Sequence, residues 1–172
     1  MIFLLSSKAW NLSLSKNLES SLKTKVFQIS NKSDLIEKLK NHHPKWIFVL
    51  HWNHIIPKEI WKEYKTVIFH MTDLPYGRGG SPLQNLIKLK HENTTLTAIE
   101  CSEIIDGGDI YLKKPLNLNG SAEEIFLRSN ELMAKMIYEI IKNEPKVKPQ
   151  KGEIIKFKRR EPSESDLSTC KH

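Results

Sequence analysis

Three short apolar runs, separated by segments of helical spacing, dominate the first third of the chain. The runs are Met1–Ser6, Lys25–Ile29 and Trp46–Leu50, and the intervening helical segments are Asn11–Leu22 and Asn31–Asn41. Trp46–Leu50 is apolar at every position, which is typical of a central parallel strand covered on both faces. Ser33 is expected to cap the second helix. The β-α-β-α-β order predicts an α/β fold, with a Rossmann-like, mostly parallel sheet flanked by helices.

The remaining elements follow from the same patterns. Strands are expected at Val67–Phe69, Thr94–Cys101 and Asp109–Lys113, the last closed by Pro115, with an edge strand at Glu153–Phe157. Helices are expected at Lys58–Tyr64, at Ser81–His91 and from a capping box at Ser121 and Glu124 to Asn143. Turns are expected at Ser7–Trp10 and at Leu74-Pro75. We expect a single catalytic domain over residues 1–160 and a polar tail over 161–172.

The charge distribution limits the kinds of partner. The net charge is +7, and Lys142–Arg160 holds eight lysines or arginines against two glutamates. This excess favours an anionic partner, or is simply a solvated basic surface. Aromatic residues are not interleaved with the basic ones, so we expect no nucleic acid as a partner. No apolar run approaches the roughly 20 residues of a membrane span, and the opening apolar stretch lacks the features of a signal peptide, so the cytoplasm is the expected compartment.

Two turns carry the residues best suited to chemistry. The stretch His70–Gly80, HMTDLPYGRGG, follows an apolar run, and the turn Asp106–Asp109, DGGD, follows another. A histidine at the end of a strand is well placed to reach a ligand in an α/β sheet. His70 and Asp106 therefore form a plausible proton-handling pair. Taken singly, each is equally well explained as a turn residue satisfied locally, and Arg78 as a solvent-facing side chain or a grip on an anion.

Together these motifs resemble the folate-dependent N-formyltransferases, whose signature is roughly Asn-x-His-x-Ser-Leu-Leu-Pro-x-x-x-Gly followed by Asp-x-Gly-Asp or Asp-Gly-Gly. His70 matches the family histidine, Asp106 the catalytic aspartate and Thr72 the serine. Leu74, Pro75 and Gly79 also match. The resemblance implies a formyltransferase-like fold and N10-formyltetrahydrofolate as the co-substrate. It also implies His70 as the stabiliser of the oxyanion or acid, and Asp106 as the proton shuttle.

The loop after the third strand, HWNHIIP, matches the family's pterin-binding loop. By this resemblance Asn53, His54, Ile55 and Ile56 contact the cofactor, largely through the backbone, together with Asp106. Read alone, its HxxH pattern suggests a metal site, but no third ligand lies nearby in sequence, so we expect no metal.

Two positions depart from the family pattern. Asp73 stands where the family has a leucine, and the second departure, at position 68, is the more serious. Ile68 stands two residues before His70, where the family has its catalytic asparagine. Isoleucine cannot donate a hydrogen bond, so one donor to the oxyanion is missing. Asn53 or His51 is the expected substitute, with Asn53 favoured as a catalytic residue. Backbone N–H groups, or loss of activity, are the alternatives.

The motifs TDLPYGRGGSP and HWNHIIP look most like the small nucleotide-sugar formyltransferases of surface glycan biosynthesis, including the pseudaminic acid route. Methionyl-tRNA formyltransferases carry a further C-terminal domain that the residues after the last helix are too few to form. We therefore expect a nucleotide-linked 4-amino-4,6-dideoxy sugar as the substrate, contacted by Thr72, Asp73, Tyr76, Arg78 and Gly79. Another small amine, or a non-catalytic folate or nucleotide-sugar binding module, are the alternatives, and the oligomeric state is left open.

Overall fold

A computed structural model of the chain describes residues 1–8 and 11–165, and it places six strands in one sheet. The strands are β1 (Ile2–Leu5), β2 (Val26–Ile29), β3 (Trp46–Val49), β4 (Lys65–His70), β6 (Asn93–Glu100) and β7 (Ile110–Asn117), in the spatial order β2-β1-β3-β4-β6-β7. The pairs from β2 through β4 are parallel, whereas β6 is antiparallel to both neighbours. The sheet is therefore mixed and mostly parallel, which confirms the predicted α/β class.

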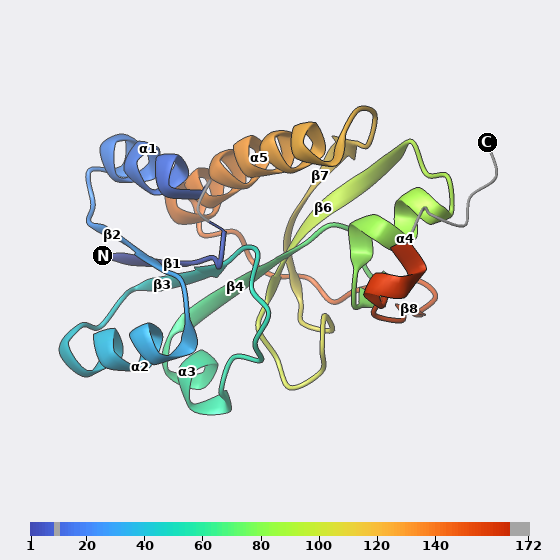
Figure 1. The fold of residues 1–172 in the computed structure, drawn as a ribbon. Helices are drawn as coiled ribbons and strands as arrows, with labels where there is room; N and C mark the ends of the chain where they lie inside the picture. Colours follow the sequence, from blue (N-terminus) through green and yellow to red (C-terminus); the bar gives the residue numbers. More distant parts are fainter. Residues whose placement is uncertain (9–10, 166–172) are drawn as a thin grey trace.

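Helices cover both faces of this sheet (Figure 1). One face carries α1 (Leu12–Leu22) and α5 (Ala122–Asn143), and the other carries α2 (Lys32–Asn41) and α3 (Lys58–Glu63). Strands β1, β3 and β4 are mainly buried, because alternate side chains face one helical layer or the other, whereas the edge strand β2 is buried only at Ile29. Two apolar cores, one on each face, hold the parallel strands so that their carboxyl ends meet at one edge.

Two helix caps test the sequence patterns. The capping box at the start of α5 is confirmed, because the Ser121 hydroxyl accepts from the Glu124 N–H and the Glu124 carboxylate accepts from the Ser121 N–H. The prediction for α2 is wrong by two residues. Its cap is Asn31, whose side-chain oxygen accepts from the Asp34 N–H at 2.9 Å, and Ser33 lies inside the first turn.

Strand β7 runs past the proline that was expected to close it. Pro115 pairs with Thr95 inside the strand, which continues to Asn117. β7 is the edge of the sheet, and an edge strand tolerates proline because one side of its backbone needs no hydrogen-bond donor.

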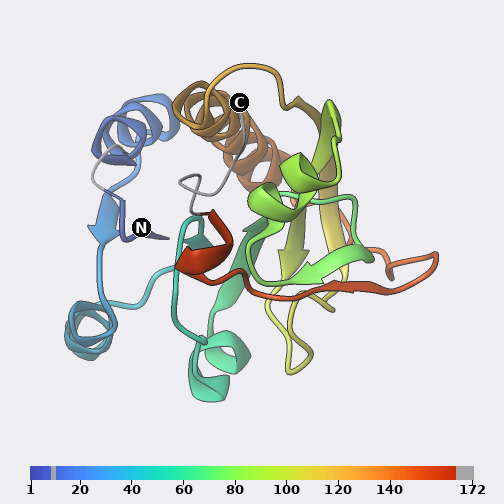
Figure 2. The same cartoon turned by 45° about the vertical axis from the view of Figure 1, so that its right-hand side comes forward.

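A second, two-stranded sheet was only half predicted. The expected edge strand near residue 155 is β8 (Ile155–Phe157), and it pairs in parallel with β5 (Tyr76–Gly79), a strand that the glycine-rich sequence concealed. Figure 2 shows this pair beside α4 (Pro82–Lys88). A Cβ at Gly79 would lie 2.4 Å from the Phe157 carbonyl oxygen, so only glycine allows this approach. The pairing brings the C-terminal segment alongside the glycines that follow His70.

The described part of the C-terminal tail, residues 161–165, adds no strand to either sheet. The polar tail predicted over 161–172 starts with a short 3-10 helix at Pro162–Ser165, and its residues 166–172 lie outside the described part. The turn predicted at Ser7–Trp10 also falls partly outside it, at residues 9 and 10. No helix in the described ranges is long and apolar enough to cross a membrane.

Candidate active site

A cleft of about 640 Å³ opens at the edge where β3 and β4 end. Four stretches of the chain line it: residues 49–56 after β3, 68–71 at the end of β4, 79–84 between β5 and α4, and 99–106 after β6. Its volume is that of a small-molecule or cofactor site. His70 and Asp106, which are far apart in sequence, both lie on its wall, as does the loop predicted to bind a pterin.

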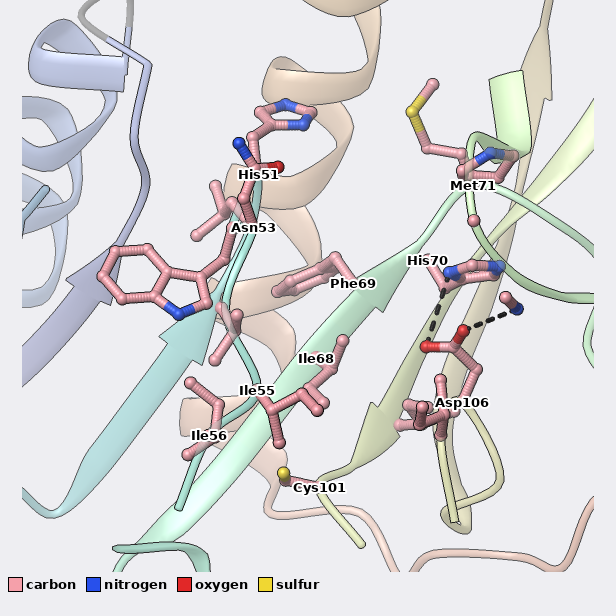
Figure 3. Close-up of a pocket in the computed structure, with 18 of the residues that line it drawn as sticks. His51, Asn53, Ile55, Ile56, Ile68, Phe69, His70, Met71, Cys101 and Asp106 are labelled. Atoms are coloured by element: carbon pink, nitrogen blue, oxygen red, sulfur yellow. Dashed lines mark hydrogen bonds and ion pairs between the residues drawn. The ribbon is translucent and has the colours of Figure 1, made fainter. Parts of the chain in front are cut away.

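His70 is the last residue of β4, and it is only 6% exposed. Its Nε2 atom lies 2.8 Å from the Gly77 carbonyl oxygen. Because a carbonyl can only accept, Nε2 carries a proton and donates it, which leaves Nδ1 as the nitrogen that can change its protonation. Nδ1 lies 3.6 Å from the Asp106 Oδ1 atom (Figure 3). The fold thus aims the reactive nitrogen of the imidazole at a carboxylate beside the cleft.

Asp106 reaches His70 from a strained turn between β6 and β7. Its φ angle is 51°, in the left-handed region that non-glycine residues avoid. The second carboxylate oxygen, Oδ2, accepts from the Gly79 N–H at 2.8 Å, which Figure 3 also marks. One carboxylate therefore joins the DGGD turn to the glycine-rich stretch, with one oxygen held by a backbone amide and the other facing the imidazole.

The two glycines after Asp106 are required by packing. A Cβ at Gly108 would lie 1.9 Å from the Glu100 carbonyl oxygen, and one at Gly107 would lie 2.5 Å from a methyl group of Ile104. The Glu100 carbonyl belongs to β6 and is held in the sheet, whereas Ile104 lies on an exposed loop that can shift as a whole. The glycines of DGGD thus let the turn fold back against the end of β6.

We expect Gly108→Ala to destabilise the fold by about 3 kcal/mol, at the upper end of what overpacking costs, because the Glu100 carbonyl must move. Gly107→Ala is the matched control and should cost well under half as much, since only the exposed loop residue Ile104 has to shift. Urea unfolding of both variants measures the difference. Equal losses for the two would show that the turn is free to readjust.

The loop after β3 presents a mixed surface to the cleft. Asn53, His54 and Ile55 are exposed, with Ile55 79% exposed, whereas Ile56 is buried at 5%. Opposite, Ile104 and Ile105 are more than 60% exposed. All of these residues line the cleft. Exposed isoleucines from two different loops give the cleft an apolar rim of the kind that holds a flat ring.

His51 stands at the cleft wall but is engaged elsewhere. Its Nε2 lies 3.1 Å from the Asn130 side-chain oxygen, and its ring packs edge-on against Phe126, both on α5. Burial lowers the pKa of His51 below 6.5, with Lys8 adding to the effect and the Asn130 hydrogen bond opposing it. His51 is therefore neutral at neutral pH and held toward α5. This weakens its case as the substitute for the family asparagine.

The lowered pKa of His51 predicts a pH dependence of stability. Below pH 6.5 the unfolded chain takes up a proton at this histidine before the folded chain does, so the free energy of unfolding falls as the pH drops below 6.5. His51→Gln keeps a donor for Asn130 but does not titrate. Urea unfolding at pH 7.5 and 5.5 should show a smaller loss on acidification for His51→Gln than for the wild type. An equal loss in both would assign the effect to other groups.

Cys101 is a partly buried free cysteine that lines the same cleft. Burial, and secondarily the charge of Asp106, raises the pKa of Cys101 to about 12. The side chain therefore stays a neutral thiol at physiological pH and acts as part of the apolar floor. Among the described residues, no three His, Cys, Asp or Glu side chains gather to hold a metal ion, at the HxxH pattern or elsewhere.

The structure places the predicted substrate residues in different surroundings. Gly79 lines the cleft. Thr72 is fully buried, and its hydroxyl donates to the Gly77 carbonyl, so it shapes the loop. Asp73 pairs with Lys113, and Asp73 and Tyr76 line a separate shallow hollow beside α4.

Arg78 is engaged by a neighbouring side chain. Its guanidinium donates to the Gln150 side-chain oxygen through Nε at 3.1 Å and Nη2 at 2.7 Å. Gln150 lies in no motif, and nothing in the sequence pointed to it. Lys8 and Arg159 are two further residues of the cleft wall that sequence reasoning did not assign. Arg159 belongs to a basic pair whose charge was visible but whose position depended on the β5–β8 pairing.

Position 68, where the family has its asparagine, lies on the cleft wall. Ile68 and His70 lie two residues apart on β4, so their side chains share one face of the strand. Ile68 lines the cleft with an apolar side chain. Asn53 lies across Phe69 and Ile68 from His70 in Figure 3, and it is exposed on the cleft wall.

Comparison with known proteins gives consistent relatives. A methionyl-tRNA formyltransferase from Caldicellulosiruptor saccharolyticus is 29% identical over 133 residues, which cover 75% of this chain and 43% of that protein. The chain spans less than half the length of the curated relatives it matches. No protein-family model matches.

Solved structures extend the likeness. A methionyl-tRNA formyltransferase from Clostridium thermocellum is 42% identical with a TM-score of 0.92, and the alignment covers 98% of this chain and 76% of that one. The formyltransferase PseJ from Anoxybacillus kamchatkensis, in complex with UDP-4,6-dideoxy-4-formamido-L-AltNAc and tetrahydrofolate, is 19% identical with a TM-score of 0.75. That alignment covers 98% of this chain and 90% of that one, and at this identity it shows a common fold.

Proposed function

The chain belongs to the formyltransferase family, and from this premise we propose that it transfers a formyl group from N10-formyltetrahydrofolate to a primary amine. The observation that carries the proposal is the convergence of His70 and Asp106, with Nδ1 and Oδ1 3.6 Å apart on the wall of an open cleft. The family expectation drawn from the sequence is confirmed by the 42% identical relative.

The residues of the cleft fit a folate. Its pterin is flat and carries donors and acceptors along one edge, so it needs apolar faces and backbone groups to pair with. Ile55, Ile104 and Ile105 supply exposed apolar surface, and the backbone at 53–56, which lies outside helices and strands, can supply amides and carbonyls. When bound, N10-formyltetrahydrofolate supplies the formyl group. Asn53, His54 and Ile56 complete the proposed cofactor site, with Asp106 at its inner end.

His70 would stabilise the negative charge that develops on the formyl oxygen. Its Nε2–H is committed to Gly77, so Nδ1, when protonated, is the donor that faces the cleft. A donor held in advance at this point lowers the barrier more than one that must be recruited from water. The Gly77 carbonyl also fixes the ring plane, so the imidazole cannot swing away from the reacting centre.

Asp106 would move the proton. The attacking amine must lose a proton, and N10 of the folate must gain one as its bond to the formyl carbon breaks. Oδ1 is the carboxylate oxygen that faces the imidazole while Oδ2 accepts from the Gly79 N–H. A carboxylate in this place can take the proton from the amine and pass it on to N10, directly or through a water molecule. Its Oδ2 stays bound to the Gly79 N–H, which keeps Oδ1 turned toward the imidazole throughout.

The amine substrate we propose is a nucleotide-linked 4-amino-4,6-dideoxy sugar. Its support is the likeness of the TDLPYGRGGSP and HWNHIIP motifs to the nucleotide-sugar enzymes, and the basic residues Lys8 and Arg159 on the cleft wall, which suit a diphosphate. Methionyl-tRNA is the second candidate, because both the 42% and the 29% identical relatives carry that name.

A formyl-transfer assay separates these candidates. Purified protein, N10-formyltetrahydrofolate and either UDP- and dTDP-linked 4-amino-4,6-dideoxy sugars or methionyl-tRNA are mixed, and release of tetrahydrofolate is followed. Turnover with the sugars supports the first proposal, and turnover with methionyl-tRNA alone replaces it with the second. Folate binding with no turnover on any amine would make the chain a binding module, the outcome that Ile68 suggests.

A further inference from the structure

One amide side chain ties the catalytic turn to the strand beside it. The Gln150 Nε2 group donates to the main-chain carbonyls of Asp106 and Gly108, both at 2.8 Å. Its Oε1 atom accepts both hydrogen bonds from the Arg78 guanidinium. A glutamine side chain has two donors and an acceptor oxygen with two lone pairs, so its full capacity is used here.

The segment around Gln150 is itself anchored to the sheet. The Lys148 N–H donates to the Ile110 carbonyl at 3.0 Å, and the Ile110 N–H donates to the Lys148 carbonyl at 2.8 Å. This isolated bridge fixes the backbone two residues before Gln150 to the first residue of β7. Gln150 therefore arrives beside the 106–108 turn from a fixed point, although it is separated from that turn by the whole of α5.

Arg78 decides which way the amide faces. A guanidinium has only donors, so the side-chain oxygen of Gln150 must turn toward Arg78. The NH₂ group then faces the turn, where it donates to the carbonyl oxygens of Asp106 and Gly108. A neutral partner such as serine could pair with either end of the amide, whereas arginine permits only the orientation that holds the turn.

The turn needs such support because it has little of its own. Asp106 adopts a left-handed backbone conformation that a residue with a side chain resists. The preceding residues, Ile104 and Ile105, are more than 60% exposed, so they bury little apolar surface against the turn. Within the loop, the Gly107 N–H donates to the Ile104 carbonyl, and the carbonyls of Asp106 and Gly108 depend on Gln150.

We propose that Gln150, oriented by Arg78, is a positioning residue that fixes the Asp106 carboxylate at its place between the Gly79 amide and the His70 imidazole. The proposal rests on the proposed function for its effect on turnover, and on the geometry alone for its effect on the carboxylate. Misplacement of a catalytic group by about 1 Å can cost on the order of 100-fold in rate. We expect Gln150→Ala to lower kcat by about 10- to 100-fold, with the KM for N10-formyltetrahydrofolate within about threefold of wild type.

The Gly79 amide reports on the carboxylate without any need for turnover. Its hydrogen bond to Asp106 Oδ2 slows exchange with solvent, whereas the neighbouring Gly80 amide donates to the Phe157 carbonyl and is independent of Asp106. Hydrogen exchange measured by NMR on the full chain should therefore show at least tenfold faster exchange at Gly79 in Gln150→Ala, with Gly80 within about twofold of wild type. Asp106→Ala sets the upper limit for Gly79.

Three further variants sharpen the test. Gln150→Glu keeps an acceptor for Arg78 but faces the turn carbonyls with oxygen, so it should lose the clamp as fully as Gln150→Ala. Lys148→Ala is the matched control, because its bridge to Ile110 is made by backbone atoms and should leave both exchange and kcat unchanged. If Gln150→Ala fails to fold, Arg78→Gln, whose neutral amide can pair with either end of the Gln150 side chain, should still raise Gly79 exchange.

The outcomes separate cleanly. Faster exchange at Gly79 alone, with reduced kcat, supports the positioning role. Unchanged Gly79 exchange in folded Gln150→Ala and Gln150→Glu overturns it, whatever happens to stability. If the wild type shows no turnover with any amine, the proposed function fails, and the exchange rates still decide whether Gln150 positions Asp106.

Discussion

Replacing His70 by asparagine is expected to lower kcat for formyl transfer by about 10³-fold, within the range of 10²–10⁴ that a positioned acid or base contributes. Asparagine can still donate toward Gly77, so the loop should survive, but it cannot present a protonated ring nitrogen to the cleft. Steady-state kinetics with N10-formyltetrahydrofolate measures kcat and KM. We expect the KM for folate to change little, because the cofactor residues of the 53–56 loop are untouched.

Asp106→Asn provides the partner measurement. The amide oxygen can still accept from the Gly79 N–H, so the turn should keep its place, while the proton acceptor beside His70 is lost. Because the two groups would act as one unit, the double variant should be hardly slower than His70→Asn alone. Losses that multiply in the double variant would contradict the pair, and full activity in either single variant would remove that residue from the mechanism.

The parallel half of the fold was predictable because its signals are local. Each of β1, β2 and β3 is a run of apolar residues within a few positions of the predicted bounds, and each helix between them has an apolar stripe. Buried strands need continuous apolar sequence and covering helices need helical spacing, so the pattern and the structure follow from the same physical requirement.

The small β5–β8 sheet could not be predicted in full, because its reason lies in a contact between distant residues. Tyr76–Gly79 has two glycines and an arginine in four residues, which is a poor strand by composition. It pairs because Gly79 lets the Phe157 carbonyl approach closely. Only that pairing places Arg159 at the cleft and brings the C-terminal segment near the site.

The candidate site divides in the same way. His70 and Asp106 each begin a recognisable motif, so the sequence was enough to select them as candidate site residues. Thr72 and Arg78 belong to the same motif as His70, yet they contact Gly77 and Gln150. Successive residues of a loop face different directions, and the sequence does not show which direction each one takes. Gln150 carries no sequence signal at all, since a glutamine acquires a role only through the groups that surround it.

Asn53→Ala is expected to lower kcat by about 10²–10³-fold if Asn53 is the donor that replaces the family asparagine, since losing one oxyanion donor costs about that much. The residue is exposed on the cleft wall, whereas the other candidate, His51, is bound to Asn130. His51→Gln is therefore the control and should stay within about threefold of wild-type kcat. Equal, small effects of both variants would exclude both side chains.

The same prediction can be tested by rescue. Ile68 and His70 share a face of β4, so an asparagine at position 68 would place its amide beside the imidazole. We expect Ile68→Asn to restore kcat at least tenfold in the Asn53→Ala background and to raise it little in the wild type, where a donor is already present. Because Ile68 also packs between Val49 and Ile99, urea unfolding should accompany the kinetics. A folded double variant with no gain in kcat would show that the missing donor is not an amide at position 53, and that backbone N–H groups stabilise the oxyanion instead.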